Sequence, residues 1–344
     1  MSLPTTTRQW FFPKRDSYRD LTLGEAPLPS TPSPNEVLVK IYAVSLQFRD
    51  LMLSKPGYPG LIQPRLVPCS DMAGEVLAVG QGVKQWKIGD RVSANLFLDK
   101  TDEELTPAIA ASALGGPVHG VLTEFRAFPA HSLVAIPEHL SYEEASTLPC
   151  AALTAYAALS SLKAGDTILV IGTGGVSIFA LRFAIASGAS VIALSSSDQK
   201  LEVVKSLGAK HIINYNTTPR WDEEVLKLTR GFGVDLVVEV TGNTTMERSV
   251  ASVKMGGHIA IVGRLASGPT VDLILPAIRK ALNIHGIYGG SVKQFKQMNR
   301  LITANPESTR PVIDKVFAFD EVHAAYAHLE SQAHVGKVVI RVAE

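Results

Sequence analysis

The spacing of apolar positions divides the chain into a first part rich in short strands, a middle part of alternating strands and helices, and a mixed end. A polar arm and a Pro-rich, extended lead-in over residues 26–34 come before the alternating run Glu36–Ser45, which predicts a strand. Short strand patterns then recur between Gly and Pro turns, which is typical of a compact β-barrel. We expect a short helix over 47–53, strands over 72–79, 91–93, 121–128 and 132–136, a loop at 55–64 and a surface excursion at 98–117.

The middle part is organised around residues 164–207, where a short apolar run, a glycine turn and a helical pattern follow one another. Thr167–Ile171 is rich in β-branched residues, as expected for a buried strand of a parallel sheet. The apolar residues of 176–186 have helical spacing, Gly188 ends that pattern, and a second strand is expected over 190–194. This is a βαβ unit.

The flanking segments predict the domain organisation. Residues 141–162 have a helical pattern, in which Ser141 is a plausible N-cap and Glu144 completes a capping box. Further strands are expected at 212–215, 236–240, 258–262 and 284–288, and a tail of short strands with one helix covers 310–344 and ends in a strand at 337–342. This order predicts a nucleotide-binding α/β domain inserted into a split partner, with the active site in the cleft between them.

The glycine turn between strand and helix indicates a dinucleotide site. Gly172 allows the tight turn, and Gly174 lets a pyrophosphate approach the backbone. The helix that begins near Gly175 and Val176 directs its N–H groups and positive dipole end at that anion. The third fingerprint position holds Ser177, which is small enough to let helix and strand pack closely.

The end of the second strand favours NADP(H) over NAD(H). An acidic residue there would bond the ribose hydroxyls of NAD, whereas this chain has Ser195 and Ser196, with Lys200 just inside the next helix. Tyr215 could stack on the adenine or contact the same phosphate. The alternative is that Lys200 is solvated and the serines only form an N-cap cluster.

Composition limits the other function classes. The chain has 344 residues, a net charge of +1 and two cysteines, Cys69 and Cys150. A near-neutral charge gives no indication of a nucleic-acid or membrane-surface partner, and two cysteines form neither a disulfide framework nor a structural zinc cluster. The first residues lack an apolar signal core and no apolar run reaches membrane length, so we expect a soluble cytoplasmic protein. No Ser/His/Asp set or carboxylate pair supports hydrolysis.

Six motifs in one order support a family resemblance. They are SLQFRDL at 45–51, PCSDMAGEV at 68–76, GDRV at 89–92, LPCAALTAY at 148–156, GTGGV at 172–176 and GKVVI at 336–340. With them the chain resembles the zinc-independent, quinone-oxidoreductase-like members of the medium-chain dehydrogenase/reductase superfamily. The resemblance implies a doubly wound Rossmann domain at 149–290, inserted into a GroES-like β-barrel domain at 1–148 and 291–344, and a homodimer that pairs through the sheet edge near 284–289.

The resemblance also bears on zinc. Zinc-dependent relatives have a cysteine where this chain has Gln47, a His-Glu pair where it has Ser70 and Asp71, and their third ligand at Cys150. Gln, Ser and one Cys do not make a zinc site, and the segment of their structural zinc, 98–117, contains no cysteine. We therefore expect no metal.

Without a metal, the favoured reaction is the NADPH-dependent reduction of an activated C=C or a quinone, because the negative charge is then delocalised and a few hydrogen-bond donors suffice. The alternatives are a metal-free alcohol dehydrogenase or carbonyl reductase, and a protein that binds NADPH without turnover. The partner is expected to be a small carbonyl, enone or quinone.

The family pattern supplies the remaining candidate residues. Gln47 and Asp50 stand in a turn that lines the nicotinamide side, where Asp50 could also merely brace the turn. Tyr58 is the best nearby donor of a proton or hydrogen bond, or else a residue that shapes the pocket. The candidate cofactor contacts are Thr154, Gly242, Gly263 and Lys337.

Overall fold

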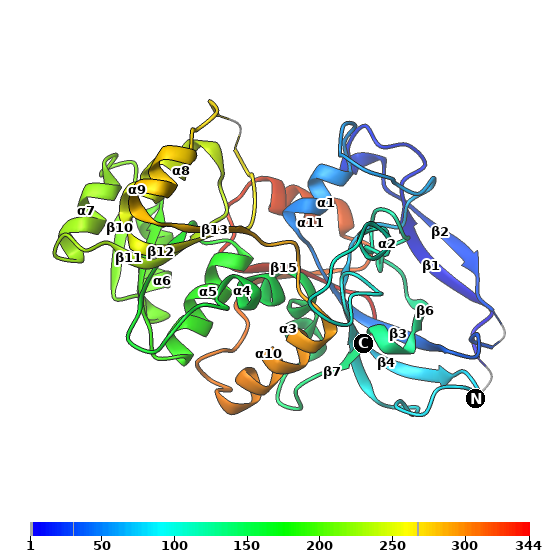
Figure 1. The fold of residues 1–344 in the computed structure, drawn as a ribbon. Coiled ribbons are helices and arrows are strands. Elements are labelled where there is room, and N and C mark those ends of the chain that lie inside the picture. The colour runs from blue at the N-terminus through cyan, green and yellow to red at the C-terminus, as the bar shows by residue number, and fades with distance from the viewer. Residues whose placement is uncertain (1–2, 30, 267) are drawn as a thin grey trace. The chain divides into compact units, whose positions relative to one another are not determined.

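The computed structural model describes residues 3–29, 31–266 and 268–344. Its contacts divide the chain into two units. Unit 1 runs up to Leu153 and includes Gly289–Thr303 and the residues from Pro311 onward, whereas unit 2 consists of Thr154–Tyr288 and Ala304–Arg310. Figure 1 gives the elements of both units. In the described ranges, no helix combines the length and the apolar character needed to cross a membrane.

Unit 1 is a β-rich body with a few short helices. Its strands are β1 (Thr6–Phe11), β2 (Thr22–Pro27), β3 (Glu36–Ser45), β4 (Asp71–Val79), β5 (Arg91–Ala94), β6 (Phe125–Pro129), β7 (Leu133–Ala135), β14 (Ile313–Ala318) and β15 (Lys337–Arg341). Its helical segments are η1 (Tyr18–Asp20), α1 (Phe48–Leu53), α2 (Pro107–Ala110), η2 (Ala130–Ser132), α3 (Tyr142–Ser146), η3 (Leu148–Ala152), α10 (Val292–Ala304) and α11 (Val322–Glu330).

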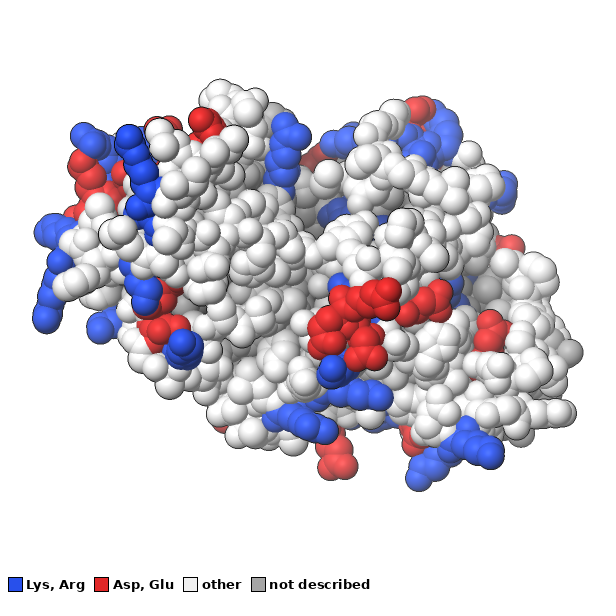
Figure 2. Space-filling model, viewed as in Figure 1, with Lys and Arg blue, Asp and Glu red and all other residues white. Residues whose placement is uncertain are grey.

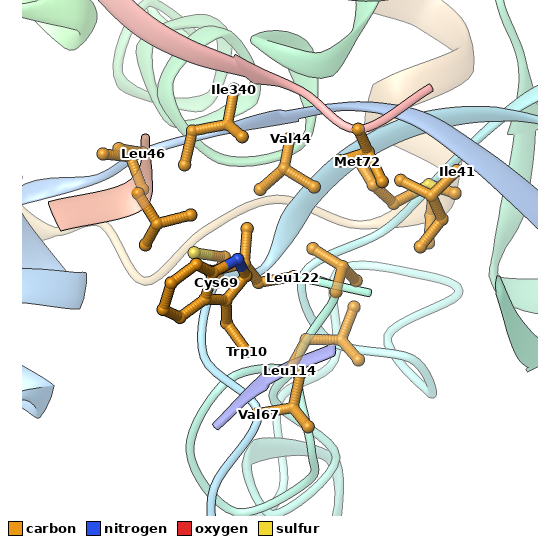
Figure 3. Packing of buried hydrophobic residues seen from close by; sticks show 14 of the residues in the cluster. Trp10, Ile41, Val44, Leu46, Val67, Cys69, Met72, Leu114, Leu122 and Ile340 are labelled. Atoms are coloured by element: carbon orange, nitrogen blue, oxygen red, sulfur yellow. The ribbon is translucent and has the colours of Figure 1, made fainter. Parts of the chain in front are cut away.

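The central strand of unit 1 is β3. The sheet order is β14-β15-β3-β4-β5-β7, and β6 also pairs with β3. β3 pairs with β4, β6 and β15, and Val37, Val39 and Ile41, which alternate along the strand and so share one face, are fully buried. Figure 3 shows part of the resulting core, in which Trp10 and Cys69 lie among aliphatic side chains.

The N-terminal segment differs from the sequence expectation. It is not a polar arm, because β1 and β2 form an antiparallel hairpin with Thr6 opposite Pro27. The side chain of Trp10 is 7% exposed, and its Nε1 donates a hydrogen bond to the Phe319 carbonyl at 2.8 Å. The partner of the Trp10 side chain lies near the far end of the chain, so the local pattern could not reveal this contact.

Three further segments differ from their expected structure. The helix expected over 141–162 is divided into α3, the π-helical η3 and α4, because Pro149 has no N–H to continue the ladder. Its capping box is confirmed by the Ser141 and Glu144 hydrogen bonds of 2.9 and 3.2 Å. The strand expected over 121–128 begins only at Phe125, and the excursion at 98–117 is partly core, with Leu114 fully buried.

Unit 2 contains a parallel six-stranded sheet in the order β10-β9-β8-β11-β12-β13. The predicted α/β class with a doubly wound parallel sheet is therefore confirmed. The strands are β8 (Thr167–Ile171), β9 (Ser190–Ser195), β10 (His211–Asn214), β11 (Val234–Glu239), β12 (Val253–Ile261) and β13 (Asn283–Gly286). The helices are α4 (Leu153–Ala158), α5 (Gly175–Ala186), α6 (Asp198–Ser206), α7 (Trp221–Leu228), α8 (Asn243–Ser252) and α9 (Ile274–Lys280).

The strand order reverses direction at β8. From β8 the chain runs outward through β9 to β10, and then returns to β11, on the other side of β8, and continues to β13. Because parallel crossovers are right-handed, α5 and α6 cover one face of the sheet and α8 covers the other. A reversal of this kind leaves a crevice at the carboxyl ends of the strands, where α/β proteins bind their ligands.

Candidate functional site

The candidate cofactor residues of unit 2 lie at one edge of its sheet. Gly172 follows β8, Ser195 ends β9, Tyr215 follows β10, Gly242 follows β11 and Gly263 lies just beyond β12. Since these strands are all parallel, their carboxyl ends meet at the same edge. The fold thus brings to one edge five residues that are up to 91 positions apart in the sequence.

The glycine turn is shaped to receive an anion. Gly172 has φ of +79°, and a Cβ built there or on Gly174 would meet no atom within 4 Å. Gly174 is the N-cap of α5 and brings no side chain to bond the first N–H groups of the helix, Gly175 and Val176 among them. Ser177 is 2% exposed, and its Oγ donates to the Ile171 carbonyl at 2.7 Å. The turn therefore fits the pyrophosphate of a dinucleotide.

The end of β9 presents hydroxyl groups. Ser195 is 4% exposed and its Oγ accepts a hydrogen bond from Ser197 N at 3.3 Å, whereas Ser196 is exposed. Ser197 caps α6 by accepting from Lys200 N, so the N-cap alternative applies to that serine. Tyr215 is 38% exposed, and its N–H donates to the Ser195 carbonyl at 3.0 Å.

A buried carboxylate that the sequence analysis missed holds the β11–α8 turn. Glu239 is fully buried, and its Oε1 accepts from Thr241 N at 2.9 Å, Gly242 N at 3.0 Å and Thr245 Oγ1 at 2.7 Å. Its Oε2 accepts from Ser249 Oγ at 2.5 Å. These bonds fix Gly242 at φ of +94°. An acidic residue at the end of an apolar strand was the signal in the sequence.

Two further candidates of unit 2 are packed closely. A Cβ on Gly263 would lie 2.8 Å from the Val240 carbonyl oxygen, so the close approach of these two strand ends requires glycine. Thr154 lies in α4 and is 6% exposed.

In unit 1, the candidate residues are gathered around a fully buried carboxylate, Asp71. It accepts hydrogen bonds from Gln47 Nε2, from Ser70 Oγ at 2.6 Å and from Cys150 N at 3.1 Å. Because an ionised carboxylate only accepts, the amide of Gln47 is fixed with its nitrogen toward Asp71. The three donors come from the α1 N-cap, from the start of β4 and from η3.

A second buried carboxylate, Asp50, lies one turn into α1. Its Oδ2 accepts from Gln47 N at 2.7 Å. Within the described part of the chain its Oδ1 has no hydrogen-bond partner. Burial raises the pKa of Asp50 to about 7 and that of Asp71 to about 6.

Lys337 supplies the positive charge of this cluster. It is 3% exposed, and its Nζ donates to the Leu46 carbonyl. Burial lowers the pKa of Lys337 from its ordinary value, and the nearby Asp71 opposes that shift. In unit 1, Lys337 is thus a buried neighbour of Asp71 and Asp50, which its position in the sequence did not reveal.

The cluster lacks the chemistry of a metal site. Burial raises the pKa of the Cys150 thiol to about 12, so in the metal-free chain the thiol keeps its proton at neutral pH. Gln47 Nε2 and Ser70 Oγ both donate to Asp71 and are therefore engaged. Over the described ranges of the chain, no group of three or more His, Cys, Asp or Glu side chains is arranged to hold a metal ion.

Tyr58 lies in the loop after α1 and is half-buried. Its hydroxyl accepts a hydrogen bond from Arg49 Nε at 3.1 Å. Arg49 is thus a functional candidate that the sequence analysis missed, and a single arginine in a helix carries no pattern by which to find it.

The buried carboxylates predict a pH dependence of stability. Because Asp50 has a pKa of about 7 when folded and an ordinary value of 3.8, the folded chain retains a proton that the unfolded chain releases between these values. The free energy of unfolding should therefore fall as the pH rises from about 4 to 7, by at most about 1.4 kcal/mol per pH unit for one proton. Asp50→Asn keeps an oxygen for Gln47 N but cannot titrate. The free energy of unfolding of this variant, measured by urea unfolding at several pH values, should therefore fall less steeply with pH.

Asp90→Asn is the matched control, because Asp90 is only partly buried and its described side-chain bond is one that it accepts from the backbone N–H of Lys87 in a turn. An unchanged slope in Asp50→Asn, or an equal change in the control, would contradict this assignment.

Comparison with known proteins places this geometry in a family. Two family models match, the alcohol dehydrogenase GroES-like domain over residues 33–138 and the zinc-binding dehydrogenase over 175–304. The zinc-type alcohol dehydrogenase-like protein C1773.06c of Schizosaccharomyces pombe is 44% identical over 327 residues, covering 92% of this chain and 94% of that protein. Acryloyl-coenzyme A reductase of Metallosphaera sedula is 30% identical over 322 residues, covering 90% and 93%.

Solved structures support the same family assignment. A Sinorhizobium meliloti 1021 protein described as an alcohol dehydrogenase superimposes with a TM-score of 0.92 at 35% identity, covering 99% of this chain and all of that one. The 2-octenoyl-CoA carboxylase reductase CinF, solved with NADP and 2-octenoyl-CoA, gives 0.85 at 27% identity, covering 98% and 88%.

The name of one family model implies zinc, and the donor set around Asp71 does not fit that ion. The glycine turn, in contrast, fits the nucleotide that such enzymes share, and the GroES-like match identifies the β-rich unit. The chain therefore belongs to the medium-chain dehydrogenase/reductase superfamily and is an NAD(P)-dependent oxidoreductase.

Proposed function

We propose that the protein is an NADPH-dependent reductase of small molecules that carry an activated C=C bond or a quinone. The observation that carries this proposal is the state of the Asp71 cluster, in which the amide of Gln47, the hydroxyl of Ser70 and the backbone of Cys150 already donate to one carboxylate. These groups are engaged and the Cys150 thiol is protonated. The negative charge that develops on the substrate is therefore stabilised by other hydrogen-bond donors of the protein and by solvent.

This arrangement favours acceptors whose anion is delocalised. The bound cofactor supplies a hydride. Addition of that hydride to the β-carbon of an enone moves the π electron pair to the carbonyl oxygen, and a proton from water completes the reaction at the α-carbon. Tyr58 donates a hydrogen bond to the enolate oxygen. Gln47, whose amide is held by Asp71, positions the start of α1. A simple ketone would instead localise a full alkoxide, which needs stronger stabilisation.

The relatives support both this proposal and its main alternative. Acryloyl-coenzyme A reductase and CinF are named for substrates with conjugated C=C bonds, whereas the S. pombe and S. meliloti proteins carry alcohol dehydrogenase names. A metal-free alcohol dehydrogenase is therefore the second candidate.

A substrate panel tests the proposed reaction. The purified protein is assayed with NADPH and an enone, an α,β-unsaturated thioester, a quinone and a ketone, and with NADP and a secondary alcohol. We expect kcat/KM for the best conjugated acceptor to exceed that for the ketone by about 100-fold or more, since an enolate needs less stabilisation than an alkoxide. Chelator treatment should leave the rate unchanged. Preference for the alcohol would support the second candidate, whereas loss of turnover on chelation would contradict both candidates, because neither uses a metal.

Ser196→Asp tests the preference for NADPH. A carboxylate at this exposed position after β9 would repel the 2'-phosphate, so the Kd for NADPH should rise about tenfold or more while that for NADH stays within about twofold. Titration of protein fluorescence with each nucleotide measures both values. Ser206→Asp, at the far end of α6, is the control. Equal losses for both nucleotides would argue against a phosphate contact at Ser196.

We also propose that two copies of the chain pair through the β13 edge of unit 2. The edge strand β13 has one neighbour in the sheet, and α9 beside it presents Ile274, Leu275 and Ile278 at 73%, 49% and 71% exposure. Figure 2 shows an uncharged surface over β13, with basic side chains at the place of α9, whose last turn carries Arg279 and Lys280. A patch of this kind is typical of an interface.

The dimer predicts a mass change in one variant. Ile278→Lys should convert a dimer to a monomer in sedimentation equilibrium at micromolar protein, because it would place a charge in an apolar contact. Ile88→Lys, which changes a 68%-exposed residue of unit 1, should leave the mass unchanged. A monomeric mass for the unaltered protein would refute the proposal.

A further inference from the structure

Arg49 connects the loop at 55–64 with the segment at 98–117, the two parts of unit 1 whose shape we expect to form the wall of the substrate pocket. It projects from α1, and its Nε donates to the hydroxyl of Tyr58, in the loop 55–64, at 3.1 Å. Its Nη1 donates to the carbonyl of Leu114, in the segment 98–117, at 2.9 Å. One guanidinium group therefore holds a side chain of the first loop and the backbone of the second.

The space around this guanidinium is shaped for it. A Cβ on Gly116 would lie 2.8 Å from Arg49 Nη2, so glycine leaves room for the group. The Arg49 Cζ atom lies 5.8 Å from the centre of the Tyr58 ring. Gln63 ties the same loops a second time, through hydrogen bonds to the carbonyls of Gly116 at 3.0 Å and Pro117 at 2.6 Å. These contacts give the two loops one common arrangement.

The Arg49 guanidinium stays protonated in this environment. Burial acts to lower the pKa of Arg49, but Tyr58 and Asp50 outweigh it and leave that pKa above its ordinary value. A guanidinium does not give up its proton at any pH at which the protein is folded. Arg49 thus acts as a permanent cation and hydrogen-bond donor, and not as an acid.

We propose that Arg49 is a positioning residue, which holds the Tyr58 hydroxyl as a hydrogen-bond donor toward the carbonyl oxygen of the substrate. The N–H of Arg49 occupies a lone pair of the Tyr58 oxygen, so the hydroxyl proton points away from Arg49. A donor that also accepts from a cation is polarised and binds an oxyanion more strongly. This role rests on the proposed reduction of a conjugated carbonyl.

Four variants test the proposal through kinetics. Arg49→Gln and Tyr58→Phe should each lower kcat for the best conjugated acceptor by about tenfold or more, the range seen when one oxyanion donor is removed or misplaced. The double variant should be no slower than the slower single variant, since both changes remove one interaction. Arg49→Lys should recover part of the rate. The Kd for NADPH should stay within about twofold in all four.

Arg15→Gln is the matched control. Arg15 also donates to a backbone carbonyl of α1, that of Leu53 at 3.0 Å, and it is described with no bond to Tyr58 or Leu114. We expect its kcat to stay within about twofold of the unaltered protein. Multiplying effects of Arg49→Gln and Tyr58→Phe, or an equal loss in Arg15→Gln, would overturn the positioning role.

A second measurement separates this inference from the proposed function. Amide hydrogen exchange of residues 55–64 and 112–117, followed by mass spectrometry, needs no turnover. Exchange of both segments should quicken in Arg49→Gln and not in Arg15→Gln, because Arg49 bonds to both segments whereas the described bond of Arg15 goes to Leu53. Unchanged exchange would refute the connection, whereas failure of the unaltered protein to reduce any conjugated acceptor would refute the proposed reaction and leave the exchange result standing.

Discussion

The buried carboxylate of Asp71 is the constraint on which the candidate site of unit 1 depends. A carboxylate without water must be compensated by hydrogen bonds or charge, and each lost partner leaves a large desolvation penalty. Asp71 obtains its partners from Gln47, Ser70 and Cys150, which lie on three separate segments. The three segments are thereby fixed relative to one another, and the π-helical η3 brings its backbone N–H to the carboxylate where a regular helix would bond internally.

Unit 2 also contains a buried carboxylate that accepts several hydrogen bonds, but all of its donors lie around one turn. Glu239 is also fully buried, but four donors around the β11–α8 turn satisfy it, so it stabilises the turn that ends in Gly242. In contrast, the described partners of Asp50 leave one of its oxygens unbonded. Glu239 and Asp50 are therefore similarly buried but have different effects on the structure. Glu239 makes a rigid turn, whereas Asp50 leaves unit 1 with a group that titrates near neutrality.

The sequence predicted the elements whose evidence is local. The β8–α5 turn could be predicted locally, because Gly172 adopts φ of +79°, which favours glycine whatever the rest of the chain does, and Gly174 leaves open space where an anion can approach the backbone. The β1 strand was missed because Trp10 finds its partner at Phe319, 309 positions away. The role of Asp71 as an acceptor of three hydrogen bonds, and the charge of Lys337 near it, were not predicted for the same reason. A buried charge is recognised by its partners, and those partners come together only in the folded chain.

The placement of these charges also indicates where specificity can vary. Substitution within the Asp71 cluster would leave a charge or donor buried without its partner, so this part of the site tolerates little change. The loops at 55–64 and 98–117 are not under this restriction, since many of their residues are exposed and only a few contacts join them. A change of substrate size can therefore be accommodated in the loops while the cluster stays fixed. In this chain the polar chemistry that tolerates little change therefore lies on β4, η3 and α1, whereas the part of unit 1 that can vary lies in the loops that Arg49 connects.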